Sequence, residues 1–351
     1  MLVVGIETSC DETAVALVED GLHVRSNVIG SQIEHHRPFG GVVPEIAARA
    51  HLELLLPVVD RALVEAGCTY EDLEGVAVTV GPGLVGALLV GLAGAKSLAL
   101  ALDVPLIGVN HLEGHVFATQ IEFGPLQVPL LALIVSGGHT SLVLLDEQGR
   151  FSTVGSTIDD AAGEAFDKVA RFLGLPYPGG PEIDRLAAGG DPRAFRFPRA
   201  MLHDGTFDFS MSGLKSAVVR DLRREVAAGR EVDLADVAAS FQEALVEVGV
   251  RKTLAAAEAH DVQRVAVVGG VAANSRLRAL MEEACRAADM QLLVPSPALC
   301  TDNGAMIAVA GAYRLAAGER TGLEVEADPG LQLGRLPMPP FAPTALGRAR
   351  S

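Results

Sequence analysis

Short apolar runs alternate along the chain with longer segments in which apolar residues recur at helical spacing. The short runs predict buried strands at residues 3–7, 13–18, 76–80, 106–109, 130–135, 140–145 and 265–268. The longer segments predict helices at residues 44–66, 84–102, 161–173, 182–188, 212–227, 234–260, 273–288 and 302–317. Because strands alternate with helices, we expect an α/β fold with mainly parallel sheets covered by helices.

One unit of this pattern occurs twice. Near the start, the strand at 3–7 leads through a polar turn into a second strand that begins at Thr13. Later, the strand at 130–135 leads through the turn Ser136-Gly137-Gly138-His139 into a strand that begins at Thr140. We interpret the two units as hairpins that open two similar lobes.

The overall composition limits the possible partners. A net charge of −16 gives the chain no general positive field, so any RNA contact needs a local basic patch or a basic partner protein. The four cysteines form no CxxC pair, which indicates a reducing compartment and a cytoplasmic location. The strand-like start lacks the pattern of a secretory signal.

The longest apolar run, at residues 84–102, has the length of a membrane span. It is rich in glycine and alanine and contains Lys96 and Ser97, which favours a buried helix packed closely on a sheet. We therefore expect no membrane partner.

A pair of histidines stands just beyond the strand at 106–109. His111 and His115 are one helical turn apart, so both lie on one face of a helix, within reach of one metal ion. Zinc proteases use a similar spacing, but their glutamate directly follows the first histidine. Here Glu113 lies roughly 200° from His111 around the axis, on the far side of the helix. Two histidines with ordinary hydrogen bonds are the alternative interpretation.

Three loops follow apolar strands and are rich in small or hydroxyl-bearing residues. They span residues 8–13, 136–140 and 269–275. Glycine lets a backbone approach a phosphate closely, and hydroxyl and N–H groups supply hydrogen-bond donors. Each loop alone is also explained as a tight turn, but the three together resemble the nucleotide-binding loops of the actin, Hsp70 and sugar-kinase superfamily.

This resemblance implies a two-lobed fold with a cleft between duplicated lobes. The first lobe would be residues 1–128, and the second residues 129–300 with a helical insertion. A final helix, at about 302–325, would return to the first lobe, and the segment 337–351 is expected to be disordered because it lacks periodicity. Asp302 is either the N-cap of that helix or a third metal ligand beside the two histidines.

Six motifs occur in an order that closely resembles one family. They are residues 5–13, Gly81-Pro82-Gly83, the His111/His115 pair, and residues 135–140, 269–274 and 301–304. The family is TsaD, formerly called glycoproteases, and the resemblance covers residues 1 to about 320. It implies transfer of a threonylcarbamoyl group from threonylcarbamoyl-AMP to N6 of adenosine 37, in tRNAs that read codons beginning with A.

The resemblance also implies the site residues. A divalent metal, Fe²⁺ or Zn²⁺, would be held by His111, His115 and Asp302. Archaeal relatives have a tyrosine ligand where this chain has Ile134, which leaves the fourth position to water or substrate. The nucleotide side of the substrate would contact Ile134, Val135, Ser136, Gly137, Gly138, Asp167, Gly180, Asp184 and Asn274.

The implied reaction suits these residue types. The acceptor amine is a weak nucleophile, and the donor is an activated mixed anhydride that a metal would orient and polarise. No general base is needed at the histidines, in agreement with the displaced Glu113. Asp11 or Glu12 is a candidate acceptor for the amine proton, the alternative being a solvated carboxylate in a turn.

A tRNA contact is expected at one local basic patch, because the chain as a whole is acidic. Its members are Arg193, Arg196, Arg199, Lys215, Arg220, Arg223 and Arg224. A helix face neutralised by salt bridges is the alternative interpretation of this patch. The resemblance further implies the bacterial partner proteins TsaB and TsaE.

Two other functions remain open from the sequence. A metalloprotease would explain the histidine pair but not the position of Glu113. An ATP-dependent kinase or chaperone-like ATPase would explain the three loops, but it gives no reason for a His-His-Asp metal site.

Overall fold

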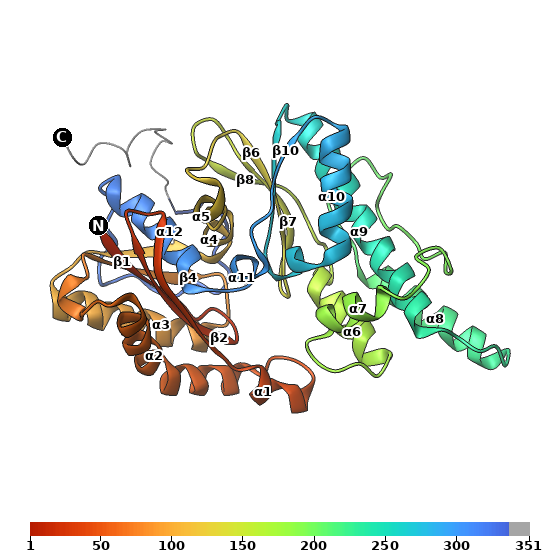
Figure 1. Ribbon diagram of the computed structural model, residues 1–351, viewed down its shortest axis with the longest axis horizontal. Coiled ribbons are helices and arrows are strands. Elements are labelled where there is room, and N and C mark those ends of the chain that lie inside the picture. The colour runs from red at the N-terminus through yellow and green to blue at the C-terminus, as the bar shows by residue number, and fades with distance from the viewer. Residues whose placement is uncertain (337–351) are drawn as a thin grey trace. The chain divides into compact units, whose positions relative to one another are not determined.

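The computed structural model of the chain describes residues 1–336, which form two units that each contain a five-stranded sheet (Figure 1). Unit 1 comprises residues 1–128, 146–151 and the described residues from 301 onward, and unit 2 comprises residues 129–145 and 152–300. The segment 337–351, for which we expect disorder, lies outside the described residues.

The two sheets share one strand order. Unit 1 has the order β3-β2-β1-β4-β5, and unit 2 has the corresponding order β8-β7-β6-β9-β10. The strands of the first sheet are β1 (Leu2–Glu7), β2 (Glu12–Glu19), β3 (His23–Ser31), β4 (Gly75–Gly81) and β5 (Leu106–Asn110). Those of the second are β6 (Leu130–Val135), β7 (Thr140–Leu145), β8 (Phe151–Ser156), β9 (Arg264–Val268) and β10 (Gln291–Leu293). The shared order confirms the predicted α/β fold with duplicated units.

The sheets are mixed, so the prediction of mainly parallel sheets is wrong. β1 pairs antiparallel with β2, and β2 antiparallel with β3, whereas β1–β4 and β4–β5 are parallel. In unit 2, β6 is likewise antiparallel to β7 and parallel to β9. The physical reason is the length of the connections: the turns after β1 and β2 are too short for a parallel crossover, which needs a dozen or more residues.

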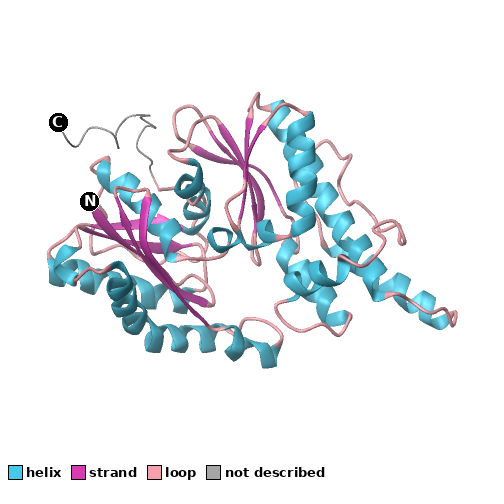
Figure 2. Ribbon diagram, viewed as in Figure 1, coloured by secondary structure: helices cyan, strands magenta, loops and turns pink. Residues whose placement is uncertain are grey.

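Helices cover both sheets (Figure 2). In unit 1 they are α1 (Ile33–His36), η1 (Arg37–Phe39), α2 (Pro44–Ala66), η2 (Tyr70–Asp72), α3 (Val85–Leu102), α4 (His111–Phe117), α5 (Thr119–Phe123) and α12 (Gly304–Ala316). In unit 2 they are α6 (Ala162–Phe172), α7 (Gly179–Ala187), α8 (Ser212–Ala227), α9 (Leu234–Ala259), η3 (Gly270–Ala273), α10 (Ser275–Ala287) and α11 (Pro297–Cys300). The long predicted helices are therefore present, with ends that differ by three residues or fewer, except that the final helix ends at Ala316 and does not extend to about residue 325.

The sheet of unit 1 is buried on both faces. Alternate residues of β1 point to opposite faces, and Val4 and Ile6 pack in a core with residues of α2 and α3. On the other face, a Cβ added to Gly5 would lie 2.4 Å from the backbone nitrogen of Ala308 in α12. Glycine at this position lets α12 approach the strand closely, which brings the residue before the helix, Asn303, to the ends of the strands.

The core of unit 2 is formed by the other sheet with α6, α7 and α9. Phe166 of α6 and Phe241 of α9 meet edge to face with ring centroids 5.4 Å apart. Both rings are almost fully buried, together with Leu131 and Leu133 of β6. The start of α6 and the loop after β9 lie at the carboxyl end of β6, and α7 packs on α6 and α9.

Among the described residues, α3 has the length and hydropathy of a membrane-crossing helix, and a third of it is buried. It packs against β4 and α2, as we expect for a helix on a sheet. The expectation that it is buried holds for one face only: Leu88 and Leu92 are buried, whereas Leu89 and Leu100 are exposed. The physical reason is that a helix in an outer layer buries one stripe of its surface.

A segment after α12, residues 319–336, packs back onto unit 1 and was not predicted. The backbone N–H of Asp328 donates to the carbonyl of Val80 at 2.8 Å, and that of Gly83 to the carbonyl of Pro329 at 3.2 Å. The Asn110 side-chain amide donates to the carbonyl of Leu331 at 3.3 Å. The segment thereby supports the ends of β4 and β5, from which the histidine helix begins.

Candidate functional site

The histidine helix α4 starts directly at the end of β5. Asn110 is its N-cap, and the side-chain oxygen of Asn110 accepts a hydrogen bond from the Leu112 N–H at 2.9 Å. All residues of α4 are buried, including His111 and His115. The end of β5 and the cap therefore fix the start of α4, and with it the positions of both histidines.

Asp302 joins the two histidines. Its Oδ1 lies 3.6 Å from His111 Nε2 and 3.2 Å from His115 Nε2, and one ligand atom from each of the three residues lies within 4.8 Å of the others. Three ligand atoms arranged tetrahedrally about 2.1 Å from one ion lie about 3.4 Å from one another. The two distances from Asp302 to the histidines are close to this value, and the bound of 4.8 Å for the whole cluster is wider.

The N-cap of α12 is Asn303, so the interpretation of Asp302 as the cap of that helix is wrong. Asn303 Oδ1 accepts from the Met306 N–H at 3.0 Å. The shift of one residue leaves the Asp302 carboxylate directed at the histidines. Its side chain is 22 % exposed, so the cluster is partly open on the aspartate side.

The residues of the cluster fit a divalent metal. Both ring nitrogens of His115 are buried and lack a hydrogen-bond partner among residues 1–336, since the Asp302 contact is close but not aligned as a hydrogen bond. Buried polar atoms without partners are costly and uncommon, and a bound cation satisfies such an atom. Two imidazoles and one carboxylate are a donor set that suits Fe²⁺ or Zn²⁺.

The cluster favours added positive charge. Burial opposes a charge on His111, but the Glu7 and Asp302 carboxylates outweigh burial and raise the pKa of His111 to about 9. Burial likewise opposes the Glu7 charge, and the facing His111 lowers the pKa of Glu7 overall. A metal at this position replaces a proton, because only a neutral imidazole is a ligand.

Glu113 lies apart from the cluster, on the side of α4 that the helix geometry predicts. Its Oε2 is 3.8 Å from Arg314 Nη1 of α12. Burial raises the pKa of Glu113 to about 7 against the opposing charge of Arg314. The histidines therefore have no carboxylate in the position at which zinc proteases activate water.

Asp11 is the last residue of the loop between β1 and β2, and Glu12 is the first residue of β2. Burial raises the pKa of both, that of Glu12 to about 7. The Ser31 hydroxyl donates to Glu12 Oε1 at 2.9 Å, while Glu12 Oε2 is buried without a hydrogen-bond partner among residues 1–336. A half-buried carboxylate that titrates near neutrality differs from the solvated turn carboxylate of the alternative interpretation.

A buried polar network supports this loop and was missed from the sequence. His51 of α2 contacts the Thr13 hydroxyl through Nδ1 at 2.8 Å and the carbonyl of Cys10 through Nε2 at 3.0 Å. The Gln32 side-chain amide also reaches Thr13, at 3.4 Å. A histidine at a buried position of the α2 pattern was the available signal.

In unit 2, the structure brings Asp184 and Asn274 together. Asp184 accepts from the Asn274 amide at 3.3 Å, from the Ser275 hydroxyl at 2.7 Å and from the Ser275 N–H at 3.1 Å. Asn274 also caps α10 by accepting from the Leu277 N–H at 2.9 Å. The predicted pair thus forms one hydrogen-bonded group at the junction of α7 and α10.

Asp167 belongs to α6, and its side chain reaches the start of α7, where Gly179 precedes Gly180. Its Oδ1 accepts from the Gly179 N–H at 2.7 Å. A Cβ added to Gly180 would meet no atom within 4 Å, so the space above this glycine is open. The carboxylate therefore orders the glycine pair while the glycine surface stays accessible.

The loop after β6 is open at its glycines. Gly137 and Gly138 are exposed, and a Cβ on either would meet nothing within 4 Å. The Ser136 hydroxyl holds the turn by accepting from the His139 N–H at 3.1 Å. Ile134 and Val135, by contrast, have buried side chains, so in this structure those two side chains support the loop from the core.

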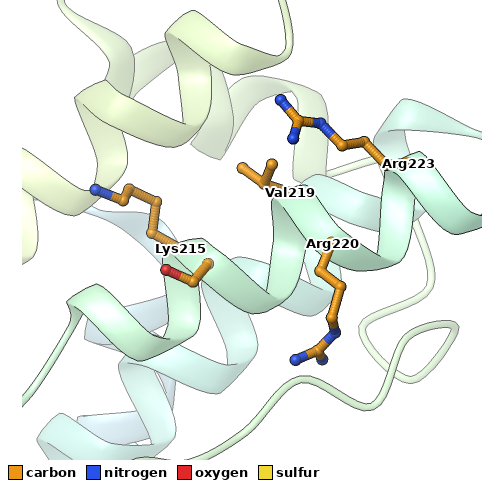
Figure 3. A pocket seen from close by; sticks show the side chains of 5 residues that line it. Lys215, Val219, Arg220 and Arg223 are labelled. Atoms are coloured by element: carbon orange, nitrogen blue, oxygen red, sulfur yellow. The ribbon is translucent and has the colours of Figure 1, made fainter.

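Figure 3 shows the basic patch on α8, where Lys215, Val219 and Arg223 follow one another at four-residue spacing. They line a pocket of about 470 Å³ together with Ser216 and Arg220. Several cations of the patch are paired with acids: Lys215 with Asp160, Arg220 and Arg224 with Asp221, and Arg199 with Glu247. No ion pair of the described chain involves Arg193, Arg196 or Arg223. Some cations of the patch are therefore neutralised by ion pairs, and the others are available to bind an anion.

The shared strand order and the loops at the strand ends define a class, the two-lobed α/β proteins of the actin, Hsp70 and sugar-kinase type. Two solved structures have this fold in common with the chain. The activator of 2-hydroxyisocaproyl-CoA dehydratase from Clostridium difficile, with bound ADPNP, has a TM-score of 0.53 and 16% identity, covering 89% of this chain and 94% of that one. HypF in its phosphate- and nucleotide-bound form has a TM-score of 0.59 and 14% identity, covering 89% and 46%.

The family follows from closer relatives. The sequence model of TsaD, described as tRNA N6-adenosine threonylcarbamoyltransferase, matches residues 23–309. Proteins of that name from Geobacter sp. (strain M21) and Geobacter sulfurreducens are 54% and 56% identical, over 96% and 93% of this chain and 98% and 96% of their own lengths. A third, from Geobacillus kaustophilus, is 54% identical over 94% of this chain and 96% of its own length. The chain belongs to the TsaD family.

Proposed function

We propose that this chain transfers the threonylcarbamoyl group of threonylcarbamoyl-AMP to N6 of adenosine 37 in tRNAs that read codons beginning with A. One observation carries the proposal beyond family membership: His111, His115 and Asp302 lie together, with Glu113 turned away toward Arg314. This arrangement suits an ion that holds and polarises a substrate, and it lacks the base with which a protease activates water.

Different residues would hold the metal, accept the proton and bind the nucleotide side of the substrate. His111, His115 and Asp302 would hold Fe²⁺ or Zn²⁺, and the ion when bound supplies orientation and polarisation of the reacting carbonyl. Glu12, or its neighbour Asp11, accepts the proton that the attacking amine loses. The nucleotide side is held by the open glycine loop with the two carboxylates and the amide, namely Ser136, Gly137, Gly138, Asp167, Gly180, Asp184 and Asn274. Ile134 and Val135 set the position of that loop.

The proposal includes tRNA and protein partners. The available arginines Arg193, Arg196 and Arg223 would contact tRNA phosphates. TsaB and TsaE would bind elsewhere, and an exposed apolar surface on the neighbouring helices α2 and α3 supports a protein interface. There, Leu52 and Leu100 are 69% and 70% exposed. None of the four cysteines forms a disulfide, which suits a reducing cytoplasm.

The experiment is a reconstituted reaction. Purified chain, unmodified tRNA, threonylcarbamoyl-AMP, TsaB and TsaE are incubated, and the tRNA nucleosides are analysed by mass spectrometry. We expect threonylcarbamoyl adenosine with the wild type and with His203→Ala, whose histidine is exposed and outside the cluster. We expect at least a 100-fold lower rate with His115→Ala.

The same preparation tests the other functions. Casein cleavage that a chelator abolishes, without modified adenosine, would support the metalloprotease. ATP hydrolysis or phosphoryl transfer without modified adenosine would support the kinase or ATPase.

A further inference from the structure

Glu7, the last residue of β1, is a buried carboxylate to which the proposed reaction gives no role. Its side chain is 1% exposed. Oε1 accepts from the Ser9 N–H at 2.5 Å, and Oε2 accepts from the Thr79 hydroxyl of β4 at 2.5 Å. The third contact joins Oε2 to His111 Nδ1 at 3.0 Å.

This contact determines the tautomer of His111. An ionised carboxylate only accepts hydrogen bonds, so the proton between the two groups belongs to Nδ1 of the imidazole. The other nitrogen, Nε2, is the one that faces Asp302 at 3.6 Å. Its lone pair is then free to ligate, since a neutral imidazole carries one N–H only.

The support for Glu7 comes from two strands at the centre of the sheet. β1 lies between β2 and β4, and Thr79 belongs to β4. The Ser9 hydroxyl adds a second contact to His111 Nδ1, at 3.1 Å. The carboxylate therefore stands on rigid elements and cannot turn away without losing several hydrogen bonds.

His115 has no such support. Its Nδ1 is buried and lacks a hydrogen-bond partner among residues 1–336. The two histidines of the cluster are therefore unequal, and only His111 is held from behind by a carboxylate.

We propose that Glu7 is a positioning residue for the metal centre, holding His111 in the tautomer and ring orientation that present Nε2 to the ion. The proposal rests on the proposed function, because it assumes that His111 is a ligand. A hydrogen bond from the second nitrogen of a ligating histidine to a carboxylate orients the ring and strengthens the ligand, and its removal typically costs about 10- to 100-fold in metal affinity.

The test measures metal binding and needs no turnover. Metal-free Glu7→Ala, Glu7→Gln and wild-type proteins are titrated with Zn²⁺ against a chromophoric chelator. We expect the affinity of Glu7→Ala to fall about 10- to 100-fold. Glu7→Gln should lose less, because the amide oxygen still accepts from Nδ1. Absorption of the Co²⁺-substituted proteins reports the ligand geometry, and we expect the Glu7→Ala spectrum alone to change clearly.

Glu113→Gln is the matched control. Glu113 is a buried carboxylate of α4, the helix that carries both histidines, but it faces Arg314. The metal affinity and Co²⁺ spectrum of Glu113→Gln should therefore equal those of the wild type. If Glu7→Ala does not fold, as judged by circular dichroism, Glu7→Gln and Glu7→Asp carry the comparison. Variants that bind Zn²⁺ with wild-type affinity and give an unchanged spectrum would overturn the role of Glu7. A wild type that binds no metal would overturn the metal centre itself, which is a separate failure of the proposed function.

Discussion

Three glutamates of unit 1 are the same residue type but have different surroundings. Glu7, Glu12 and Glu113 are all buried to a large extent, yet each faces a different partner: His111, the Ser31 hydroxyl and Arg314. The balance between burial and the partner decides whether the charge is stabilised. Glu7 is held ionised by His111, whereas burial raises the pKa of the other two to about 7.

The raised pKa of Glu12 predicts how the rate of the reaction depends on pH. A base must be ionised to accept a proton, so a pKa of about 7 predicts a rate that rises from pH 6 to pH 8. Glu12→Gln should lower the rate about 100-fold. Ser31→Ala removes the hydrogen bond that lowers this pKa, and should move the rise to higher pH. The measurement is kcat/KM against pH, and a Glu12→Gln enzyme with the wild-type rate would exclude this base.

Glu113 predicts a pH dependence of stability. Its pKa is about 7 in the folded chain and 4.5 for a fully solvated glutamate, so the folded state binds the proton more tightly. The stability that this proton provides is complete below pH 4.5 and is lost as pH rises through 7, by about 1 to 3 kcal/mol.

Glu113→Gln should therefore lose less stability than the wild type between pH 5 and pH 8. Urea unfolding at the two pH values measures the difference. Parallel losses in the two proteins would show that Glu113 is already ionised at pH 5.

At the scale of elements, the helices were predictable because their apolar stripes are long. α2 and α8 have the predicted bounds. β3 was missed because its sequence, His23–Ser31, is mostly polar, and its strand pairing with β2 supplies what its own pattern lacks. Residues 319–336 attach through backbone hydrogen bonds and through a few apolar side chains, among them Val325 and Leu331, and so short a pattern does not show where the segment packs.

The candidate site was predictable at the residues that carry motifs, and less so at those that support them. The histidine spacing in α4 required no structure. The structure was needed to choose between Asp302 and Asn303 as the helix cap, because both residue types are good caps and the two are adjacent in the sequence. Glu7 was missed as a partner of His111, since 104 residues separate the two along the chain.

The arginines of α8 should differ in how much they contribute to tRNA affinity. Arg223→Glu should weaken tRNA binding more than Arg224→Glu, because Arg224 is already close to Asp221 and Glu225. Each lost phosphate contact should lower the slope of log affinity against log salt by about 1. Filter binding at several salt concentrations gives both quantities. Arg286→Glu on α10 is the control, and equal losses in all three variants would leave only a general charge effect.

At the scale of the whole molecule, two units of the same topology carry different groups of side chains. Unit 1 holds the His-His-Asp cluster with its buried carboxylates, and unit 2 holds the open glycine loop with Asp184 and Asn274. Because the two sheets have the same strand order, corresponding strands end at corresponding positions in both units. The residues at those ends distinguish the two units.

We propose that the three-residue cluster of unit 1 binds an ion that threonylcarbamoyl transfer requires. The most direct measurement is the rate of threonylcarbamoyl adenosine formation after chelation and after return of one equivalent of Fe²⁺ or Zn²⁺. We expect the wild type to lose the reaction on chelation and to regain it when the ion is returned, whereas His115→Ala should not regain it. A chelated, metal-free wild type that modifies tRNA at its full rate would show that the reaction needs no ion in this cluster.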